Sequence, residues 1–346
     1  MKSLFILILI VLTFSCQKEK ISIGEKVADT FYLENKGASM RVLVEGNTSS
    51  KTFLLFVHGG PGSSAYFYNS EYISENVEDK FAVAYWDQRN AGASQGNNNE
   101  DDFNLEVMTE DLEKLIVLLK YRYGEDISVF LLSHSFGGML STSFLTKDQN
   151  QTLVNGWIFA GSSHDYPLND NLSKEALELY ANQEIPLGNH VDEWQKIKDF
   201  IQGLPNQKLT LEQANELNSY ATNAETYFSN VEPFPVMDII EENAISQNYA
   251  ITSTFLNLKY SQNAAIQQEL RNYDFSQKLE NITIPVMTLF GQYDFITPPS
   301  LGQDLLSKLN STEKFDYIFP NSGHIVMHQD EVLFYEKIIQ FMNEFK

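Results

Sequence analysis

The chain has 346 residues, of which 43% are hydrophobic and 13% aromatic, with 18 glycines and 10 prolines. This composition excludes a disordered chain, a collagen-like repeat and a small disulfide-stapled scaffold, and the length suits either one large domain or a domain with a sizeable insertion. The formal net charge is −22, so phosphate backbones would be repelled and we expect no nucleic acid among the partners. A single cysteine excludes an intrachain disulfide and a cysteine-rich metal site.

The first residues have the pattern of an export signal. Lys2 precedes an apolar run from Leu4 to Phe14, which has the length of a signal peptide and is too short to span a bilayer comfortably. The segment resembles a bacterial lipoprotein signal, which implies lipidation of Cys16 and membrane attachment through acyl chains. We therefore expect an exported protein, lipid-anchored in the cell envelope, with residues 1–15 as signal peptide and 16–27 as linker. An ordinary secretory signal with an incidental cysteine is the alternative.

From residue 28 onward, short apolar runs alternate with helical patterns. The turn residues Asn35-Lys36-Gly37 predict a hairpin, and we expect Thr109 to cap a helix that ends before Gly124. Further helices are expected over 301–309 and from Glu331. Such alternation predicts a mostly parallel sheet with helices on both faces. The buried strands are expected at residues 52–57, 81–86, 127–132, 156–160, 284–290 and 315–319.

The alternation stops between residues 164 and 274. This stretch is helical in pattern, shows no convincing strand, and carries 17 acidic against 6 basic side chains. We predict that residues 164–274 form a helical cap on a core made of residues 28–163 and 275–346. An acidic cap suits a cationic ligand, although a solvated acidic surface accounts for the same composition.

A candidate nucleophile follows the strand expected at residues 127–132. That strand leads directly into Ser133-His134-Ser135-Phe136-Gly137-Gly138, and a helical pattern comes next. A strand, a sharp turn and a helix form the setting of a nucleophile elbow, where small residues flank a strained serine. Ser133 occupies the place of the first glycine in G-x-S-x-G. On this motif alone, Ser135 would more readily be a helix cap than a nucleophile.

Two loops after earlier strands also carry polar or glycine-rich motifs. His58-Gly59-Gly60-Pro61-Gly62 allows backbone N–H groups to approach a ligand closely, at the place where an oxyanion donor is needed. A tight turn without such a role is the alternative. The polar side chains of residues 86–94 are expected to stabilise loops through an internal ion pair rather than to touch substrate.

An acid and a base follow the last two expected strands. Asp294 comes after residues 284–290 and His324 after residues 315–319, which completes the chain order Ser, Asp, His. A serine nucleophile needs a base within hydrogen-bond distance, and the base needs an acid that fixes its tautomer. Asp165 is the alternative acid. A zinc site at His324 and His328, four residues apart, is disfavoured because no H-E-x-x-H pattern accompanies them.

These motifs together resemble the α/β-hydrolase superfamily and, more narrowly, the proline iminopeptidase family. The HGGPG loop, WDQR-x-x-G-x-S, S-H-S-F-G-G, G-x-x-D and S-G-H occur in the family's order and spacing. The resemblance implies an α/β-hydrolase fold with a helical cap and no cofactor or metal. It implies Ser135 as nucleophile, His324 as general base and acid, and Asp294 as orienting acid. It also implies an oxyanion hole formed by the backbone N–H groups of Gly60 and Phe136.

The resemblance extends to the substrate. In the family, acidic residues of the cap hold the free amino terminus of a peptide, and Glu225 and Glu232 lie at a spacing from Ser135 and Asp294 that suits this role. The expected activity is release of an N-terminal proline or small apolar residue from short peptides or amino-acid amides, through an acyl-enzyme. The alternatives are an esterase, lactonase or amidase that ignores a free amine, and a non-catalytic surface lipoprotein with the same fold.

Overall fold

A computed structural model describes residues 21, 23–96, 99–205, 208–233, 257 and 263–346. The expected signal peptide and Cys16 lie outside the described residues, as does part of the expected cap. Among the residues that are described, no helix is both long and apolar enough to cross a membrane.

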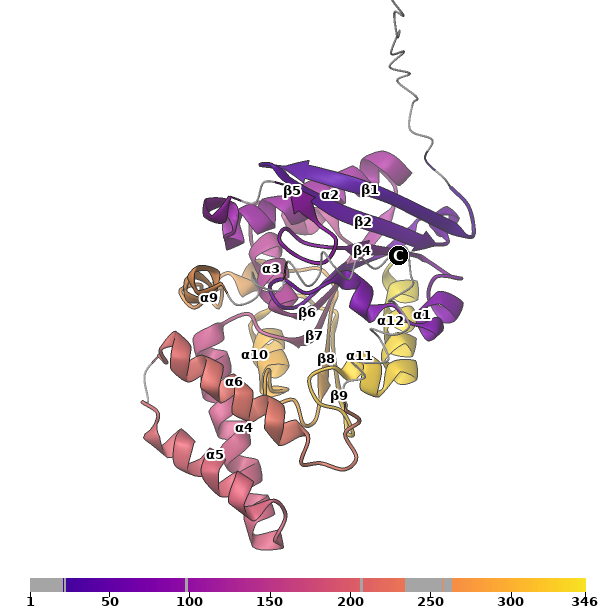
Figure 1. Ribbon diagram of the computed structural model, residues 1–346. Helices are drawn as coiled ribbons and strands as arrows, with labels where there is room; N and C mark the ends of the chain where they lie inside the picture. Colours follow the sequence, from indigo (N-terminus) through magenta and orange to yellow (C-terminus); the bar gives the residue numbers. More distant parts are fainter. Residues whose placement is uncertain (1–20, 22, 97–98, 206–207, 234–256, 258–262) are drawn as a thin grey trace, which may run out of the picture.

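A nine-stranded sheet runs through the centre of the molecule (Figure 1). Its strands are β1 (Val27–Asn35), β2 (Ala38–Gly46), β3 (Thr52–Val57), β4 (Ala82–Trp86), β5 (Gln95–Gly96), β6 (Ser128–Ser135), β7 (Gly156–Ser162), β8 (Val286–Gly291) and β9 (Lys314–Phe319). Eight of them lie in the order β1-β2-β4-β3-β6-β7-β8-β9, and β5 pairs with β2. The pairs β1–β2, β2–β4 and β2–β5 are antiparallel and all other pairs are parallel. The predicted mostly parallel sheet is therefore confirmed.

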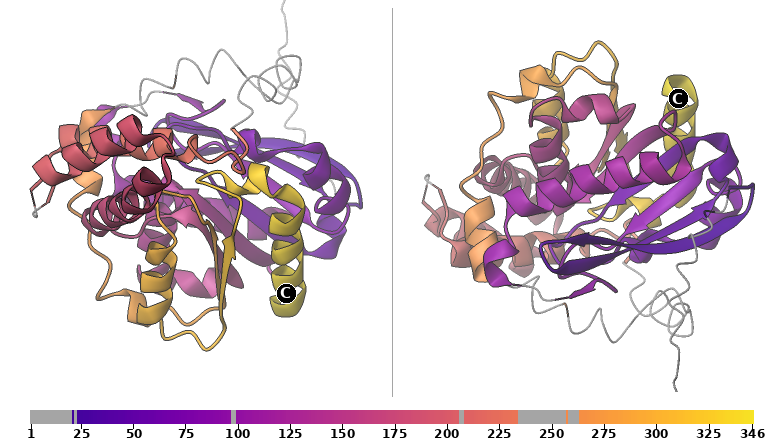
Figure 2. Two further views of the ribbon diagram at one scale, coloured as in Figure 1. Left: turned by 90° about the horizontal axis from the view of Figure 1, so that it is seen from below. Right: turned by 90° about the horizontal axis from the view of Figure 1, so that it is seen from above.

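Helices cover both faces of the sheet, as the views in Figure 2 show. One face packs against α2 (Leu105–Tyr123), α3 (Phe136–Leu145) and α10 (Ser300–Lys308). The other packs against α1 (Glu71–Asn76), α11 (Val326–Gln329) and α12 (Glu331–Phe345). Every residue of β3, β4, β7 and β8 is buried, which explains why these strands are continuous apolar runs rather than alternating patterns.

The described chain between β7 and β8 is helical, with α4 (Tyr166–Leu187), α5 (Val191–Gly203), α6 (Leu211–Glu225) and α9 (Ala264–Leu270). Helices α4, α5 and α6 extend beyond the carboxyl edge of the parallel strands (Figure 1). They share an apolar cluster of their own around Trp194 and Leu217, and Phe295 from the turn after β8 belongs to the same cluster. The inserted helices therefore have a separate core that packs directly beside Asp294.

One helix begins earlier than the sequence predicted. Helix α2 starts at Leu105, and the Asn104 side chain caps it by accepting a hydrogen bond from the Val107 N–H at 2.9 Å. Thr109 lies inside the helix, and its hydroxyl donates to the Leu105 carbonyl at 2.7 Å. The prediction of Thr109 as cap was wrong. Leu105 and Met108 are buried against the sheet, so packing stabilises one more turn than the capping pattern indicates.

Candidate active site

Ser135 lies in a sharp turn between β6 and α3. Its backbone has φ 55° and ψ −121°, a strained conformation for a residue with a side chain. Gly137 permits this turn, because a Cβ at that position would lie 1.9 Å from the Val57 carbonyl oxygen. The Ser135 side chain does not cap α3. The structure thus removes the helix-cap explanation and leaves the Ser135 hydroxyl facing a pocket.

Asp294 and His324 are held together on the turns that follow β8 and β9. The Nδ1 atom of His324 lies 3.0 Å from Oδ2 of the fully buried Asp294 carboxylate. Asp294 Oδ1 accepts the N–H groups of Ile296 at 3.0 Å and Thr297 at 2.7 Å. The Thr297 hydroxyl donates to Asp294 Oδ2 at 2.8 Å. These donors fix the carboxylate against the histidine ring.

The surroundings of His324 favour its protonated form. Burial lowers the pKa of His324, but the negative charge and hydrogen bond of Asp294 raise it, and Glu225 adds to the increase. The net result is a pKa above the ordinary value for histidine. An imidazole with this environment is well suited to take a proton from a serine hydroxyl, because the imidazolium formed is stabilised by Asp294.

Gly60 and Phe136 lie beside Ser135, as an oxyanion hole requires. Phe136 is the first residue of α3, so its N–H has no acceptor within the helix. Gly60 follows β3 with φ 118°, and both residues line the same pocket as Ser135 and His324. The three expected triad members and the two expected oxyanion donors are thus brought to one edge of the sheet.

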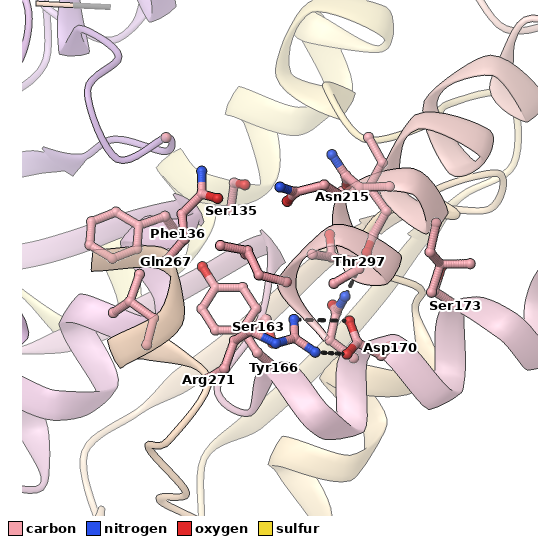
Figure 3. A pocket seen from close by; sticks show the side chains of 18 of the residues that line it. Ser135, Phe136, Ser163, Tyr166, Asp170, Ser173, Asn215, Gln267, Arg271 and Thr297 are labelled. Carbon is pink, nitrogen blue, oxygen red and sulfur yellow. Dashed lines mark hydrogen bonds and ion pairs between the residues drawn. The ribbon is translucent and has the colours of Figure 1, made fainter. Parts of the chain in front are cut away.

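The pocket below Ser135 has a volume of about 330 Å³ and extends under α4, α6 and α9. Figure 3 shows Asp170 and Arg271 as an ion pair in its wall, with Tyr166 beside them. Asp170 is 6% exposed and Arg271 is 5% exposed. Asn215 and Gln267 also face this pocket. This pair was not predicted from the sequence, because its members are 101 positions apart and no local pattern connects them.

Glu225 and Glu232 occupy different environments, and neither lines this pocket. Glu225 ends α6 and lies behind His324, where its Oε2 accepts the His324 backbone N–H at 3.2 Å. Its Oε1 is buried without a hydrogen-bond partner among the described residues. Glu232 has an exposed side chain, and its backbone carbonyl accepts a hydrogen bond from Gln329 at 2.7 Å. Their expected role in binding an amine therefore stays a prediction.

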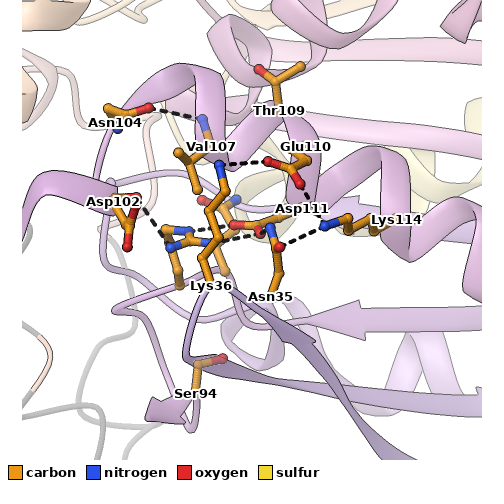
Figure 4. Close-up of polar contacts among 12 residues, drawn as sticks. Asn35, Lys36, Ser94, Asp102, Asn104, Val107, Thr109, Glu110, Asp111 and Lys114 are labelled. Atoms are coloured by element: carbon orange, nitrogen blue, oxygen red, sulfur yellow. Dashed lines mark hydrogen bonds and ion pairs between the residues drawn. The ribbon is translucent and has the colours of Figure 1, made fainter. Parts of the chain in front are cut away.

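The polar segment after β4 forms an ion pair, but its acid is Asp111 of α2 and not a residue of the segment itself. The Arg89 guanidinium contacts both oxygens of Asp111, with Nε–Oδ2 at 2.5 Å and Nη2–Oδ1 at 2.7 Å. Asn35 donates to the same carboxylate at 2.6 Å and accepts a hydrogen bond from Lys114 (Figure 4). The network joins the β1–β2 hairpin, α2 and the loop after β4, and is remote from the pocket at Ser135.

Asp165 and His328, the alternative acid and the second histidine of the disfavoured zinc site, both make structural contacts. Asp165 caps α4 by accepting a hydrogen bond from Leu168 N–H at 2.9 Å. His328 packs its ring on Tyr68, with centroids 6.4 Å apart, and burial lowers the pKa of His328 to about 4. Within the described ranges, no group of three or more His, Cys, Asp or Glu side chains is placed to hold a metal ion.

The chain is similar in sequence and in structure to several known proteins. Residues 52–331 match the family model described as the alpha/beta hydrolase fold. A proline iminopeptidase of Thermoplasma volcanium is 22% identical over 314 residues, which cover 90% of this chain and 96% of that protein. The structure of a proline iminopeptidase from Mycobacterium smegmatis aligns with a TM-score of 0.64 and 15% identity, over 91% and 98% of the two chains. An esterase from Exiguobacterium antarcticum aligns with a TM-score of 0.58 and 16% identity, over 91% and 100%.

Proposed function

Because this chain belongs to the α/β-hydrolase family, we propose that it is a serine hydrolase that works through an acyl-enzyme formed on Ser135. One observation carries the proposal: the strained Ser135 shares a pocket with His324, and His324 is hydrogen-bonded at 3.0 Å to the buried Asp294. Chain order, positions after β6, β8 and β9, and the lack of a capping bond at Ser135 all support this assignment.

The reaction follows from the positions of these groups. Ser135 Oγ attacks the substrate carbonyl while His324 Nε2 takes the hydroxyl proton, and Asp294 holds the opposite ring nitrogen in its N–H form. The oxygen of the tetrahedral intermediate turns toward the N–H groups of Gly60 and Phe136. His324 then gives the proton to the leaving group. A water molecule, activated by His324 in the same way, releases the acyl group from Ser135.

Within this class we favour an aminopeptidase that releases an N-terminal residue from short peptides or amino-acid amides. The relatives named proline iminopeptidase support this choice, and so does the acidic cap. Glu225 is the nearest candidate for contact with a substrate amine, because it lies against His324 and keeps one oxygen without a partner among the described residues. Because burial raises the pKa of Glu225 to about 8, a salt bridge to the amine would form only when the carboxyl gives up its proton.

A second candidate is an esterase or amidase that ignores a free amine. The observation that favours it is the pocket wall, where neither Glu225 nor Glu232 appears and where the carboxylate of Asp170 is already paired with Arg271. A site with this lining can bind an acyl group through hydrogen bonds without a free negative charge. The amine on the substrate then contributes nothing to binding.

The deciding assay uses p-nitroanilides of proline, alanine and phenylalanine, each with a free and an acetylated amine, beside p-nitrophenyl acetate. We expect Ser135→Ala to reduce every activity by at least about 10³-fold, because the nucleophile is lost. Activity confined to free-amine anilides supports the aminopeptidase. Ester turnover with no anilide turnover supports the second candidate. Full activity in Ser135→Ala would contradict the serine hydrolase itself.

A further inference from the structure

A buried chain of hydrogen bonds connects the glycine-rich loop to the loop that carries His324. The Gly59 N–H donates to the Tyr68 hydroxyl at 3.2 Å, and this hydroxyl lies 2.9 Å from His134 Nδ1. At the other end of the same ring, His134 Nε2 lies 3.0 Å from the His324 carbonyl oxygen. Tyr68 and His134 are each 6% exposed. These hydrogen bonds thus connect Gly59, the neighbour of Gly60, to the backbone of His324.

In each of these hydrogen bonds, the chemistry of the two atoms determines which one donates and which one accepts. A carbonyl oxygen only accepts, so His134 Nε2 must carry the hydrogen and donate it to His324. Burial lowers the pKa of His134 well below its ordinary value, and the nearby His324 lowers it further, so the ring is neutral. A neutral ring with hydrogen on Nε2 accepts at Nδ1, and the Tyr68 hydroxyl therefore donates to it. All three donors point toward His324.

The groups joined by these hydrogen bonds also contact one another, and a cavity of about 250 Å³ borders Tyr68, His134 and His324 on one side. The rings of His134 and His324 have centroids 4.8 Å apart, and those of Tyr68 and His134 are 5.5 Å apart. A Cβ at Gly59 would lie 2.9 Å from the Ser135 Cβ, so the glycine-rich loop rests directly on the nucleophile turn. The oxyanion loop, the nucleophile and the histidine loop are in contact at one place.

We propose that Tyr68 and His134 are positioning residues, which set the distance between the oxyanion donor at Gly60 and the base His324 through the hydrogen-bonded bridge Gly59–Tyr68–His134–His324. This inference rests on the proposed function. Neither bridging side chain reacts. Together they hold the Gly60 N–H and the His324 ring. These two groups act only when negative charge develops on the substrate oxygen and positive charge on His324. A shift of about 1 Å between such groups lowers the rate of the chemical step about 10²-fold.

The test compares Tyr68→Phe with the wild-type chain. The change removes one hydroxyl, leaves Gly59 without an acceptor and leaves His134 Nδ1 without a donor. We expect a fluorophosphonate probe to label Ser135 about 10- to 100-fold more slowly, since both displaced groups assist its attack. With any ester that the wild type hydrolyses, kcat should fall while KM changes less than about twofold, because the bridge supports the transition state only.

A matched control separates positioning from general loss of packing. Tyr335 is 1% exposed, and its hydroxyl has no hydrogen-bond partner within the described part of the chain. Tyr335→Phe should therefore label at the wild-type rate. His134→Gln keeps one acceptor and one donor and should retain more activity than His134→Leu, which keeps neither. Equal rates for Tyr68→Phe and Tyr335→Phe in folded protein would overturn the proposal.

The tautomer and charge of His134 can be measured by spectroscopy, which tests the bridge without any measurement of turnover. Long-range ¹H–¹⁵N spectra of the wild type at pH 7 should show His134 neutral with its hydrogen on Nε2. Hydrogen on Nδ1, or a charged ring, would overturn the bridge. Labelling that survives Ser135→Ala would instead overturn the proposed function, and the tautomer of His134 would still test the bridge by itself.

Discussion

Glu225 is a buried acid that lies against His324 and close to Asp294, so its ionisation affects the stability of the fold. Burial raises the pKa of Glu225 from 4.5 to about 8, the negative charge of Asp294 adds to the increase, and His324 opposes it. At pH 7 the neutral carboxyl predominates, still accepting the His324 N–H. Above pH 8 a second negative charge appears beside Asp294 and His324.

This placement predicts a pH-dependent effect of Glu225→Gln on stability. Between about pH 4.5 and 8 the folded state binds one proton more than the unfolded chain at Glu225, so this group makes wild-type stability fall as pH rises through that window. Glutamine keeps the acceptor for His324 but does not ionise. We expect the melting temperature of the variant, relative to wild type, to rise from pH 6 to pH 9. The exposed Glu232→Gln should give a constant difference, and a constant difference for both would contradict the buried ionisation.

The three residues of the proposed triad could be located from the sequence, and the residues that contact them could not. Ser135, Asp294 and His324 follow buried strands, so a topology rule brings their side chains to one edge without knowledge of contacts. Thr297, Tyr68 and Glu225 approach the same place from a turn, a short helix and the cap. Their contacts depend on side-chain packing between segments distant in the chain, and a single sequence carries no signal for that.

At the scale of elements, the network at Arg89 joins two segments of the sheet to helix α2 by side-chain contacts. Asp111 lies on α2, Asn35 ends β1, and Arg89 follows β4. Arg89 and Asp111 side chains are 3% and 0% exposed. Removing one member of such a buried pair leaves the other charge without compensation in the interior.

We predict that Asp111→Ala lowers the free energy of unfolding by about 3–5 kcal/mol, because the Arg89 guanidinium would stay buried without its partner. Glu110→Ala is the neighbouring control. Glu110 pairs with Lys36 and Lys114 at the surface, where the three side chains are 30%, 44% and 46% exposed, and its loss should cost about 1 kcal/mol or less. Urea unfolding at pH 7 measures both. Similar losses for the two variants would show that the Arg89 pair contributes no more than a surface contact.

How closely the bounds of each strand or helix were predicted depends on the interactions that stabilise that element. Both ends of the strand at residues 52–57 were predicted correctly. The apolar residues of this fully buried strand contrast clearly with the polar turns on either side of it. The start of α2 was misplaced by five residues, since the cap is Asn104 and not Thr109, because Thr109 followed by two acids imitates a cap. The pair β5–β2 was not predicted, as two residues contain no periodicity to detect.

For the whole molecule, charge and sequence together restrict how the protein reaches a membrane. A net charge of −22 repels the anionic headgroups that attract peripheral proteins, so electrostatic adsorption is unfavourable. The described residues also contain no helix that would span a bilayer. We propose that attachment comes from acyl chains on Cys16, where each buried CH₂ contributes about 0.8 kcal/mol and two or more chains give stable anchoring.

This proposal predicts the behaviour of the full chain expressed in a bacterium that processes lipoproteins. Wild-type protein should incorporate radiolabelled palmitate and enter the detergent phase on Triton X-114 partitioning, because the acyl chains outweigh the acidic surface. Cys16→Ser should incorporate no palmitate and should keep the wild-type hydrolase activity, since position 16 precedes Val27, the first residue of β1, in the sequence. Palmitate incorporation in Cys16→Ser would contradict acylation at Cys16. An exported wild-type chain that stays aqueous and carries no palmitate would mean that the apolar run at residues 4–14 is an ordinary secretory signal and that Cys16 is incidental.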